Sequence, residues 1–122
     1  MTTPSTTAYE AGDVVLVRFP FTDLSSQKRR PAVVLFSGAE GSRDSDLIVM
    51  ALTSRLAAES QPGEYRLQDW PSAGLLLPTM TKPLLATLSA TMIVRRLGTL
   101  ASMDRQDVAS VLSSLFGDWQ AQ

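Results

Sequence analysis

Short apolar runs alternate with polar or turn-forming segments along most of this chain. The first two runs, residues 13–19 and 31–36, are rich in valine and leucine, and the segment between them has the proline, aspartate and serine content of a loop. A third run, residues 46–54, is apolar at odd and even positions alike until it ends in hydroxyl side chains. Because strands buried on both faces read as continuous apolar runs, we predict three strands here, with the third inside a sheet.

Four more short runs follow, each bounded by glycine, proline or serine; they are residues 62–67, 73–80, 84–90 and 92–100. A parallel sheet would need helices between its strands, and this spacing leaves no room for them. The pattern therefore favours a mainly β domain, built as a compact antiparallel barrel or sandwich.

The last segment has the period of a helix. Within residues 105–116 an apolar stripe recurs at helical spacing, and its members are Val108, Val111, Leu112, Leu115 and Phe116. Ser102 or Asp104 is placed to cap the start of this helix, and Gly117 stands where a helix end favours positive φ. The stripe predicts a C-terminal helix that packs on the rest of the domain.

Length and composition narrow the classes of function. A chain of 122 residues suits one domain, which we predict over residues 10–122 after a flexible, Thr/Ser-rich tail at residues 1–9. The absence of cysteine excludes disulfides, thiolate nucleophiles and sulfur-rich zinc sites, and the absence of histidine removes the commonest metal ligand. We therefore expect no metal and no cofactor, and acid-base chemistry has to use Asp, Glu, Lys, Arg, Tyr, water or the substrate.

The net charge of -1 argues against non-specific coating of nucleic acid, since such binding needs many lysines and arginines. Three of the twelve acidic residues, Asp104, Asp107 and Asp118, lie near the C-terminus beside Arg105, which leaves ten cations and nine acids in the rest. A local basic groove is compatible with this distribution. The N-terminus has no signal-peptide pattern and no window approaches the ~20 apolar residues of a membrane span, which predicts a cytoplasmic protein without membrane contact.

Five blocks of sequence carry a resemblance to a known family. In chain order they read GDVVLVRFPFTD, KRRPAVVL, DLIVMALTS, GLLLPTMTK and RRLGTL, and the last block precedes the predicted helix. Their order resembles that of the MazF/PemK/Kid family of toxins from type II toxin-antitoxin systems. The resemblance runs from about Gly12 to Gly117, and its first two blocks with their spacing are the specific part.

The resemblance implies a small SH3-like antiparallel barrel of the CcdB/MazF/PemK type with a C-terminal helix, assembled as a homodimer. It also implies an mRNA interferase that inhibits growth, and a cognate antitoxin protein that holds it in check. Such an enzyme is a metal-independent endoribonuclease that cleaves single-stranded RNA through attack by the 2′-hydroxyl of the RNA itself. Two other interpretations stay open: a CcdB-like poison of DNA gyrase, and a non-catalytic interaction barrel.

By position, the resemblance assigns the family's catalytic arginine to Arg30, which precedes Pro31, and its catalytic threonine to Thr53. These residue types suit the reaction. An arginine fork can hold two phosphate oxygens, and a threonine hydroxyl can bond a nonbridging oxygen or orient the 2′-hydroxyl. The alternative for Arg30 is a solvated surface cation, and the alternative for Thr53 is a residue present for its β propensity.

Four further residues are candidate substrate contacts, namely Lys28, Arg29, Ser54 and Lys82. The first two act through charge alone or are simply solvated. Arg95 and Arg96 are expected to divide between structural contacts and contacts with RNA or a second subunit. Trp70 and Trp119 either stack on a base or pack in the core or at an interface.

The general base for such a reaction is unassigned. Some family members place an Arg-x-Asp pair or a histidine at the site, whereas this chain has TMTKP near one such position and no histidine. Asp23 in the first loop and Glu64 after Pro62-Gly63 are the acidic candidates for this role. The alternative for Asp23 is a turn residue that bonds its own backbone.

Overall fold

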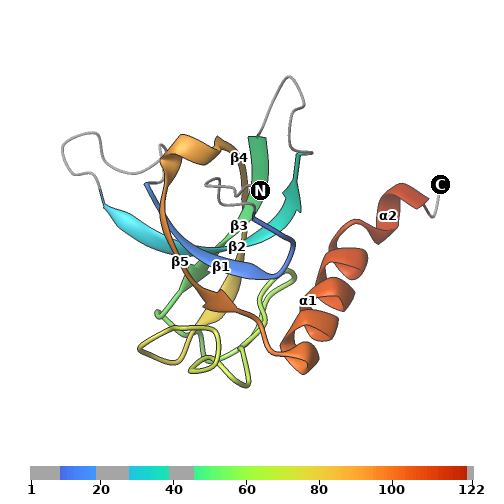
Figure 1. Cartoon of the computed structure of the whole chain (residues 1–122). Helices are drawn as coiled ribbons and strands as arrows, with labels where there is room; N and C mark the ends of the chain where they lie inside the picture. The colour runs from blue at the N-terminus through green and yellow to red at the C-terminus, as the bar shows by residue number, and fades with distance from the viewer. Residues whose placement is uncertain (1–8, 19–27, 39–45, 121–122) are drawn as a thin grey trace.

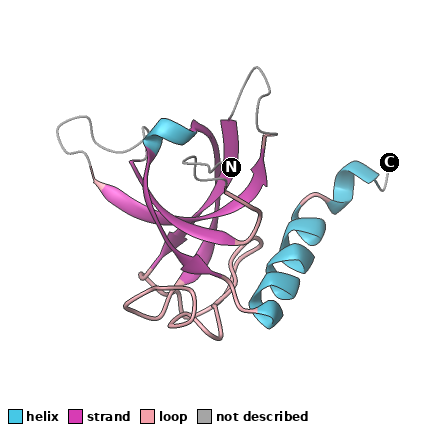
Figure 2. Ribbon diagram, in the orientation of Figure 1, coloured by secondary structure: helices cyan, strands magenta, loops and turns pink. Residues whose placement is uncertain are grey.

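A computed structural model describes residues 9–18, 28–38 and 46–120. Its sheet has five antiparallel strands in the order β4-β3-β2-β1-β5. The strands are β1 (Asp13–Arg18), β2 (Arg29–Ser37), β3 (Asp46–Thr53), β4 (Met80–Ser89) and β5 (Ile93–Thr99). A 3-10 helix, η1 (Ala90–Met92), joins β4 to β5, and the helices α1 (Ser102–Leu115) and α2 (Gly117–Gln120) follow (Figures 1 and 2).

The sheet curls into an open barrel whose edge strands are β4 and β5 (Figure 2). Irregular register between β1 and β5, between β2 and β3 and between β3 and β4 bends the strands, as bulges do. The predicted mainly β fold with a C-terminal helix is confirmed. The prediction of a central third strand is also confirmed, because β3 lies between β2 and β4.

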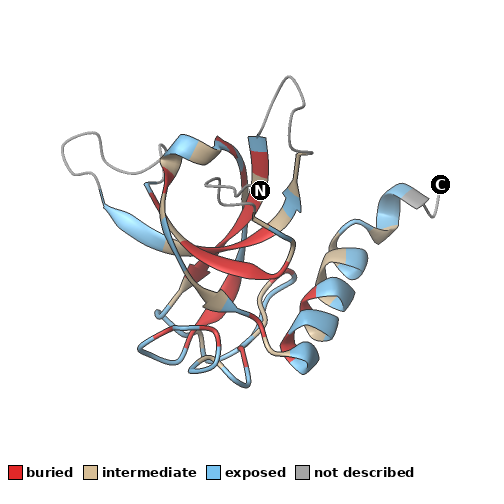
Figure 3. Ribbon diagram, viewed as in Figure 1, coloured by how far each residue is buried: buried red, intermediate tan, exposed pale blue. Residues whose placement is uncertain are grey.

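Both faces of the central strands are buried, and each face contributes to its own apolar cluster. The inner core fills the concave side of the sheet and comprises Val15, Val17, Ala32, Val34, Leu47, Val49, Ala51, Ala86, Leu88 and Ile93. The outer core lies on the other face and comprises Val14, Val33, Met50, Leu52, Leu67, Ala73, Leu75, Leu100 and Val108. Strand alternation sends neighbouring residues to opposite clusters, so β1 and β3 are red along most of their length in Figure 3, and β2 is red in its middle.

The outer core is covered by α1 and by the β3–β4 connection, residues 54–79. We predicted strands at residues 62–67 and 73–80, and this prediction is wrong for all but the end of the second run. Apart from a single bridge between Arg66 and Met80, the described connection consists of turns and loops. Its glycines and prolines break the extended backbone, while its apolar residues still pack on the sheet.

The C-terminal helix begins earlier than predicted, and neither predicted cap holds. Its N-cap is Ala101, which makes no side-chain cap bond, and Ser102 lies inside α1. Gly117 begins α2 and does not adopt positive φ. Of the predicted apolar stripe, Val108 is buried and Leu112 packs on the outer core, whereas other members are more open to solvent.

The predicted flexible tail lies outside the described residues except for Tyr9, which packs against the inner core. The prediction of one domain remains a prediction. Among the described helices, none is long and apolar enough to cross a membrane.

The β3–β4 connection touches β5 backbone to backbone at Gly74. This residue has a φ of +83°, and a Cβ added there would lie 2.0 Å from the carbonyl oxygen of Leu97. On the strand side, a Cβ added to Gly98 would lie 2.5 Å from the carbonyl oxygen of Ala73. The connection therefore packs this closely on β5 only because both positions lack a side chain.

We predict that Gly74→Ala lowers the free energy of unfolding by at least about 2 kcal/mol, because the strained φ and the backbone clash add. Urea unfolding followed by circular dichroism measures the loss. Gly117→Ala is the matched control, since nothing lies within 4 Å of the added Cβ, and it should not destabilise the protein. Equal stability of the two variants would contradict this account of the connection.

Candidate functional site

A cavity of about 800 Å³ opens where β2 begins, β3 ends and the β3–β4 connection returns to the sheet. Its apolar floor comes from alternate residues of the sheet and from the connection, and it includes Leu16, Pro31, Leu52, Leu75 and Leu97. Its polar rim carries hydroxyl and cationic side chains. The fold places this rim at one end of the barrel, where strand backbones stop and side chains face solvent.

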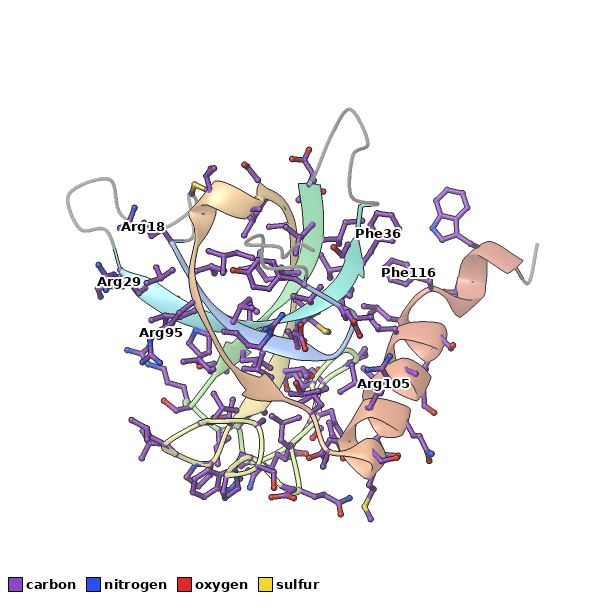
Figure 4. All side chains as sticks on the ribbon, viewed as in Figure 1. Arg18, Arg29, Phe36, Arg95, Arg105 and Phe116 are labelled. Atoms are coloured by element: carbon purple, nitrogen blue, oxygen red, sulfur yellow. The ribbon has the colours of Figure 1, made fainter. Side chains whose placement is uncertain are left out.

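Five cations line this cavity: Lys28, Arg29, Arg30, Arg55 and Arg95. All five are exposed, and no carboxylate belongs to the part of the lining that the structure describes. Arg29 and Arg95 lie at the same end of the molecule, on the side away from α1 and Arg105 (Figure 4). Clustered like charges raise the local positive potential, so the cavity is suited to an anion although the whole chain carries a charge of -1.

Arg30 and Thr53 come together through the register of β2 and β3. The strands pair Ala32 with Ala51, and Arg30 and Thr53 each lie two residues beyond this pair on adjacent strands, where both line the cavity. An anion in the cavity can therefore meet a guanidinium and a hydroxyl held on adjacent strands.

Thr53 is held both by its backbone and by its hydroxyl. Its backbone pairs with Met80 of β4, and its Oγ1 accepts a hydrogen bond of 3.1 Å from the backbone N–H of Arg55. The β-branched side chain has few rotamers, which limits the positions of the hydroxyl. The hydroxyl hydrogen is left to donate to a ligand.

The structure brings together five of the residues predicted for the site. They are Lys28, Arg29, Arg30, Thr53 and Ser54, and all of them line the cavity. Lys82 is exposed on β4 but does not line the cavity. Glu64 is also absent from the described lining, and its Oε1 accepts the backbone N–H of Gln61 at 2.8 Å within a turn. Asp23 lies outside the described residues.

Sequence reasoning missed Arg55 and left Arg95 undecided. Arg55 follows the hydroxyl pair that ends β3, so its place after a predicted site strand was the available signal. Arg95 has a partner in the register, Leu16 of β1, whose side chain also lines the cavity. That pairing is a long-range contact that sequence pattern alone does not give.

Arg96, next to Arg95, has a structural role. Its Nη2 lies 3.0 Å from Oδ2 of Asp13, its Nε donates to the same oxygen, and its guanidinium stacks 5.2 Å from the ring centre of Tyr9. Asp13 is buried and also accepts a hydrogen bond from the hydroxyl of Thr99. Arg96 therefore neutralises a buried carboxylate that ties β1 to β5.

Neither tryptophan lines the cavity. Trp70 packs against the outer core, and Trp119 on α2 is 82% exposed. The apolar surface beside the cations comes instead from leucines, because Leu76 and Leu77 of the connection are exposed and line the cavity. The site combines cations, hydroxyl donors and an apolar wall, which suits a ligand with both phosphate and apolar groups.

A family model identifies the family of this chain, and solved structures share its fold. A family model described as PemK-like, MazF-like toxin of type II toxin-antitoxin system matches residues 10–116. Among curated proteins, none matches the chain in sequence.

Solved structures are similar in fold at low sequence identity. MazF (Form-I) from Deinococcus radiodurans has a TM-score of 0.68 and 24% identity, over 92% of this chain and 99% of that chain. An endoribonuclease in complex with its cognate antitoxin, from a mycobacterial species, has a TM-score of 0.68 and 14% identity, over 90% and 96%. Mycobacterium tuberculosis toxin MazF-mt6 has a TM-score of 0.66 and 15% identity, over 86% and 96%.

We predict that Arg95 and Arg96 separate binding from stability. Inorganic pyrophosphate should raise the melting temperature of the wild type, and Arg95→Gln should remove at least about half of that rise, since it deletes one of the clustered cations. Arg96→Gln should keep the rise but lower the free energy of unfolding by about 1 kcal/mol, because Asp13 loses its ion pair. Thermal unfolding with and without pyrophosphate measures both effects. The reverse pattern would contradict the division of roles.

Proposed function

This chain belongs to the PemK-like, MazF-like toxins of type II toxin-antitoxin systems, and we propose that it acts as a metal-independent endoribonuclease on single-stranded RNA. The observation that supports the proposal most is the cavity that Arg30 and Thr53 line together, with four further cations. Solved proteins of the same fold carry the names MazF and endoribonuclease. We place the activity in the cytoplasm.

The reaction we propose uses the 2′-hydroxyl of the RNA as the nucleophile. Its oxygen attacks the adjacent phosphorus, the P–O5′ bond breaks, and the products are a 2′,3′-cyclic phosphate and a free 5′-hydroxyl. One proton leaves the 2′-hydroxyl and one proton is given to the departing 5′-oxygen. The proposed reaction requires no metal or cofactor. It cannot proceed on DNA, because DNA lacks the 2′-hydroxyl nucleophile.

Arg30 and Thr53 would act on the negative charge that develops in this reaction. The guanidinium of Arg30 can donate two parallel hydrogen bonds to nonbridging phosphate oxygens and remains charged throughout. The hydroxyl of Thr53 can donate to the same phosphate or orient the 2′-hydroxyl. Preorganised donors of this kind contribute about 3 kcal/mol each to the transition state.

The other cations would hold the RNA strand on either side of the scissile phosphate. Lys28, Arg29, Arg55 and Arg95 line the same cavity, and Ser54 adds a second hydroxyl. Bases adjoining the phosphate would pack on exposed Leu76 and Leu77. Such binding should weaken as salt rises, because each phosphate contact releases counterions.

Proton transfer needs a group other than the cations and hydroxyls of the cavity. No Asp or Glu occurs among the described residues that line the cavity, so charge stabilisation is the catalytic contribution we assign there. Asp23 stays a predicted general base. Glu64 is a weaker candidate, since its carboxylate already accepts a backbone hydrogen bond in a turn away from the described lining.

A homodimer and an antitoxin complete the proposed assembly. Exposed Phe36, Phe116 and Trp119 offer apolar area that a second copy would cover. A cavity that attracts phosphates should also attract an acidic, partly disordered antitoxin segment that orders over Arg30 on binding. We propose that the antitoxin inhibits by occupying the RNA site.

The decisive test is cleavage of single-stranded RNA by the purified protein in EDTA, read by mapping new 5′ ends. We predict that Arg30→Ala reduces the cleavage rate at least about a hundredfold without unfolding the protein, because a preorganised phosphate donor is lost. Arg105→Ala is the control for loss of one charge, since Arg105 lies on α1 away from the cavity (Figure 4).

Cleavage that survives Arg30→Ala would show that the site is wrong. A wild-type protein that leaves RNA intact would overturn the enzymatic proposal. Inhibition of DNA gyrase by that protein would then favour the CcdB-like interpretation, and its absence would favour a non-catalytic interaction barrel.

Occlusion by the antitoxin makes a separate prediction. A fluorescent 2′-deoxy oligonucleotide should bind the free toxin, and its anisotropy should fall to the unbound value when the cognate antitoxin is added at a saturating level. Toxin carrying Arg30→Ala should also bind the antitoxin more weakly, because both ligands use the same cation. An antitoxin complex that still binds the oligonucleotide would contradict inhibition by occlusion.

A further inference from the structure

Asp104 is a buried carboxylate that the proposed reaction does not use. It lies in the first turn of α1, and its exposed fraction is 0%. The carboxylate bonds the β3–β4 connection at three points: Oδ1 accepts the Tyr65 hydroxyl at 2.7 Å and the backbone N–H of Gln68 at 2.8 Å, and Oδ2 accepts the backbone N–H of Asp69 at 2.8 Å. Because a buried charge is costly unless it is bonded, these contacts fix the connection to the helix.

The charge on Asp104 is maintained by the groups around it. Burial alone would raise the pKa of this carboxyl, but the hydrogen bonds from Tyr65, Gln68 and Asp69 outweigh burial and hold the pKa below its ordinary value of 3.8. Burial and the bonds to Asp104 and Asp107 raise the pKa of Tyr65, so its hydroxyl stays protonated. The Tyr65 hydroxyl also lies 2.9 Å from Oδ2 of Asp107, one turn along α1. These hydrogen bonds therefore keep Asp104 ionised and Tyr65 protonated at neutral pH.

Two backbone hydrogen bonds continue from this cluster to the cavity. The N–H of Leu67 donates to the carbonyl of Thr79 at 3.0 Å, and the N–H of Thr81 donates to the carbonyl of Tyr65 at 2.8 Å. Between these bonds Arg66 forms a bridge with Met80. Residues 65–67 thus lie as a short extended segment against residues 79–81.

Residues 79–81 reach the candidate site directly. Thr79 lines the cavity, and Met80 pairs with Thr53 across β3 and β4. At the other end of this segment, Thr81 is buried, and its hydroxyl donates a hydrogen bond to the carbonyl of Gly63 at 2.9 Å. A continuous series of bonds therefore runs from Asp104, through residues 65–69 and 79–81, to Thr53.

We propose that Asp104 is a positioning residue for RNA cleavage: by holding residues 65–69 on α1, it fixes residues 79–81 and, through them, Thr53 and the adjoining cavity wall. The inference rests on the proposed function for its catalytic consequence. Most of the cations that hold RNA come from β2 and β5, outside the segments that Asp104 holds. Loss of Asp104 should therefore impair the chemical step more than binding.

The test is Asp104→Asn. The carboxamide keeps the shape of the side chain, but its NH₂ cannot accept the N–H of Asp69, so one bond to the connection is lost and two donors face each other. The single-turnover cleavage rate should fall at least about tenfold, while the dissociation constant of a 2′-deoxy oligonucleotide changes less than about twofold. A merely structural role would not separate these two quantities.

Hydrogen exchange tests the physical link without any activity. In Asp104→Asn, the amides of Leu67 and Thr81 should exchange at least about tenfold faster, because their partners belong to the segments that Asp104 holds. Asp107→Asn is the matched control on the same helix, since it keeps an oxygen that can accept from Tyr65 and leaves the three bonds of Asp104 in place. It should alter neither exchange nor cleavage.

Tyr65→Phe serves if Asp104→Asn does not fold, because it removes one bond and leaves both backbone bonds to the carboxylate. Intermediate losses in cleavage and protection are expected for it. Faster exchange with an unchanged cleavage rate, or equal losses in cleavage and binding, would overturn the inference. A wild type that does not cleave RNA would overturn the proposed function and the catalytic consequence together, and hydrogen exchange would then decide the structural link alone.

Discussion

The structure depends on covering a sheet that is apolar on both faces. The concave face of β1, β2 and β3 is closed by the curl of the sheet itself, but the outer face needs other elements. One helix, α1, covers part of it, and the β3–β4 connection covers the rest with few backbone hydrogen bonds of regular structure. A loop can bury apolar side chains only if its polar backbone groups find partners. The site follows from this constraint, because the connection that covers the outer core also forms a wall of the cavity.

In the cavity, by contrast, like charges are gathered together. Five cations with no carboxylate in the described lining repel one another, and a surface selected for stability alone would intersperse opposite charges. A bound polyanion would relieve this repulsion, so the same arrangement that costs stability in the free protein contributes to affinity. Arg96 illustrates the difference at the neighbouring position, since its carboxylate partner neutralises it within the fold. The cations of the cavity have no such carboxylate among the described residues of the lining.

Much of the sheet could be predicted from sequence because strands buried on both faces form short, continuous apolar runs. The continuous apolar run of residues 46–54 identified a central strand, and the predicted Arg30 and Thr53 do line one cavity. The connection could not be predicted in the same way. Its apolar residues resemble strands, yet they pack through turns that depend on contacts distant in sequence, such as Gly74 against β5. Asp104 was misread as a helix cap for the same reason: a helix-start carboxylate gives one local signal, whether it bonds its own helix or residues 35 positions away.

A carboxylate is the side chain that this position of α1 requires. Three donors from the connection converge on Asp104, and only a group with several lone pairs and no donor of its own can accept from all of them. An apolar residue would leave the backbone N–H groups of Gln68 and Asp69, which are partly buried in these bonds, without their acceptor, and this costs more than the net gain of an ordinary hydrogen bond. The negative charge of Asp104 is tolerated in the interior because the hydrogen-bond donors that need an acceptor there also stabilise the charge. The same group therefore satisfies the outer core's polar backbone and sets the geometry of residues 79–81, so covering the sheet and shaping the site are one requirement.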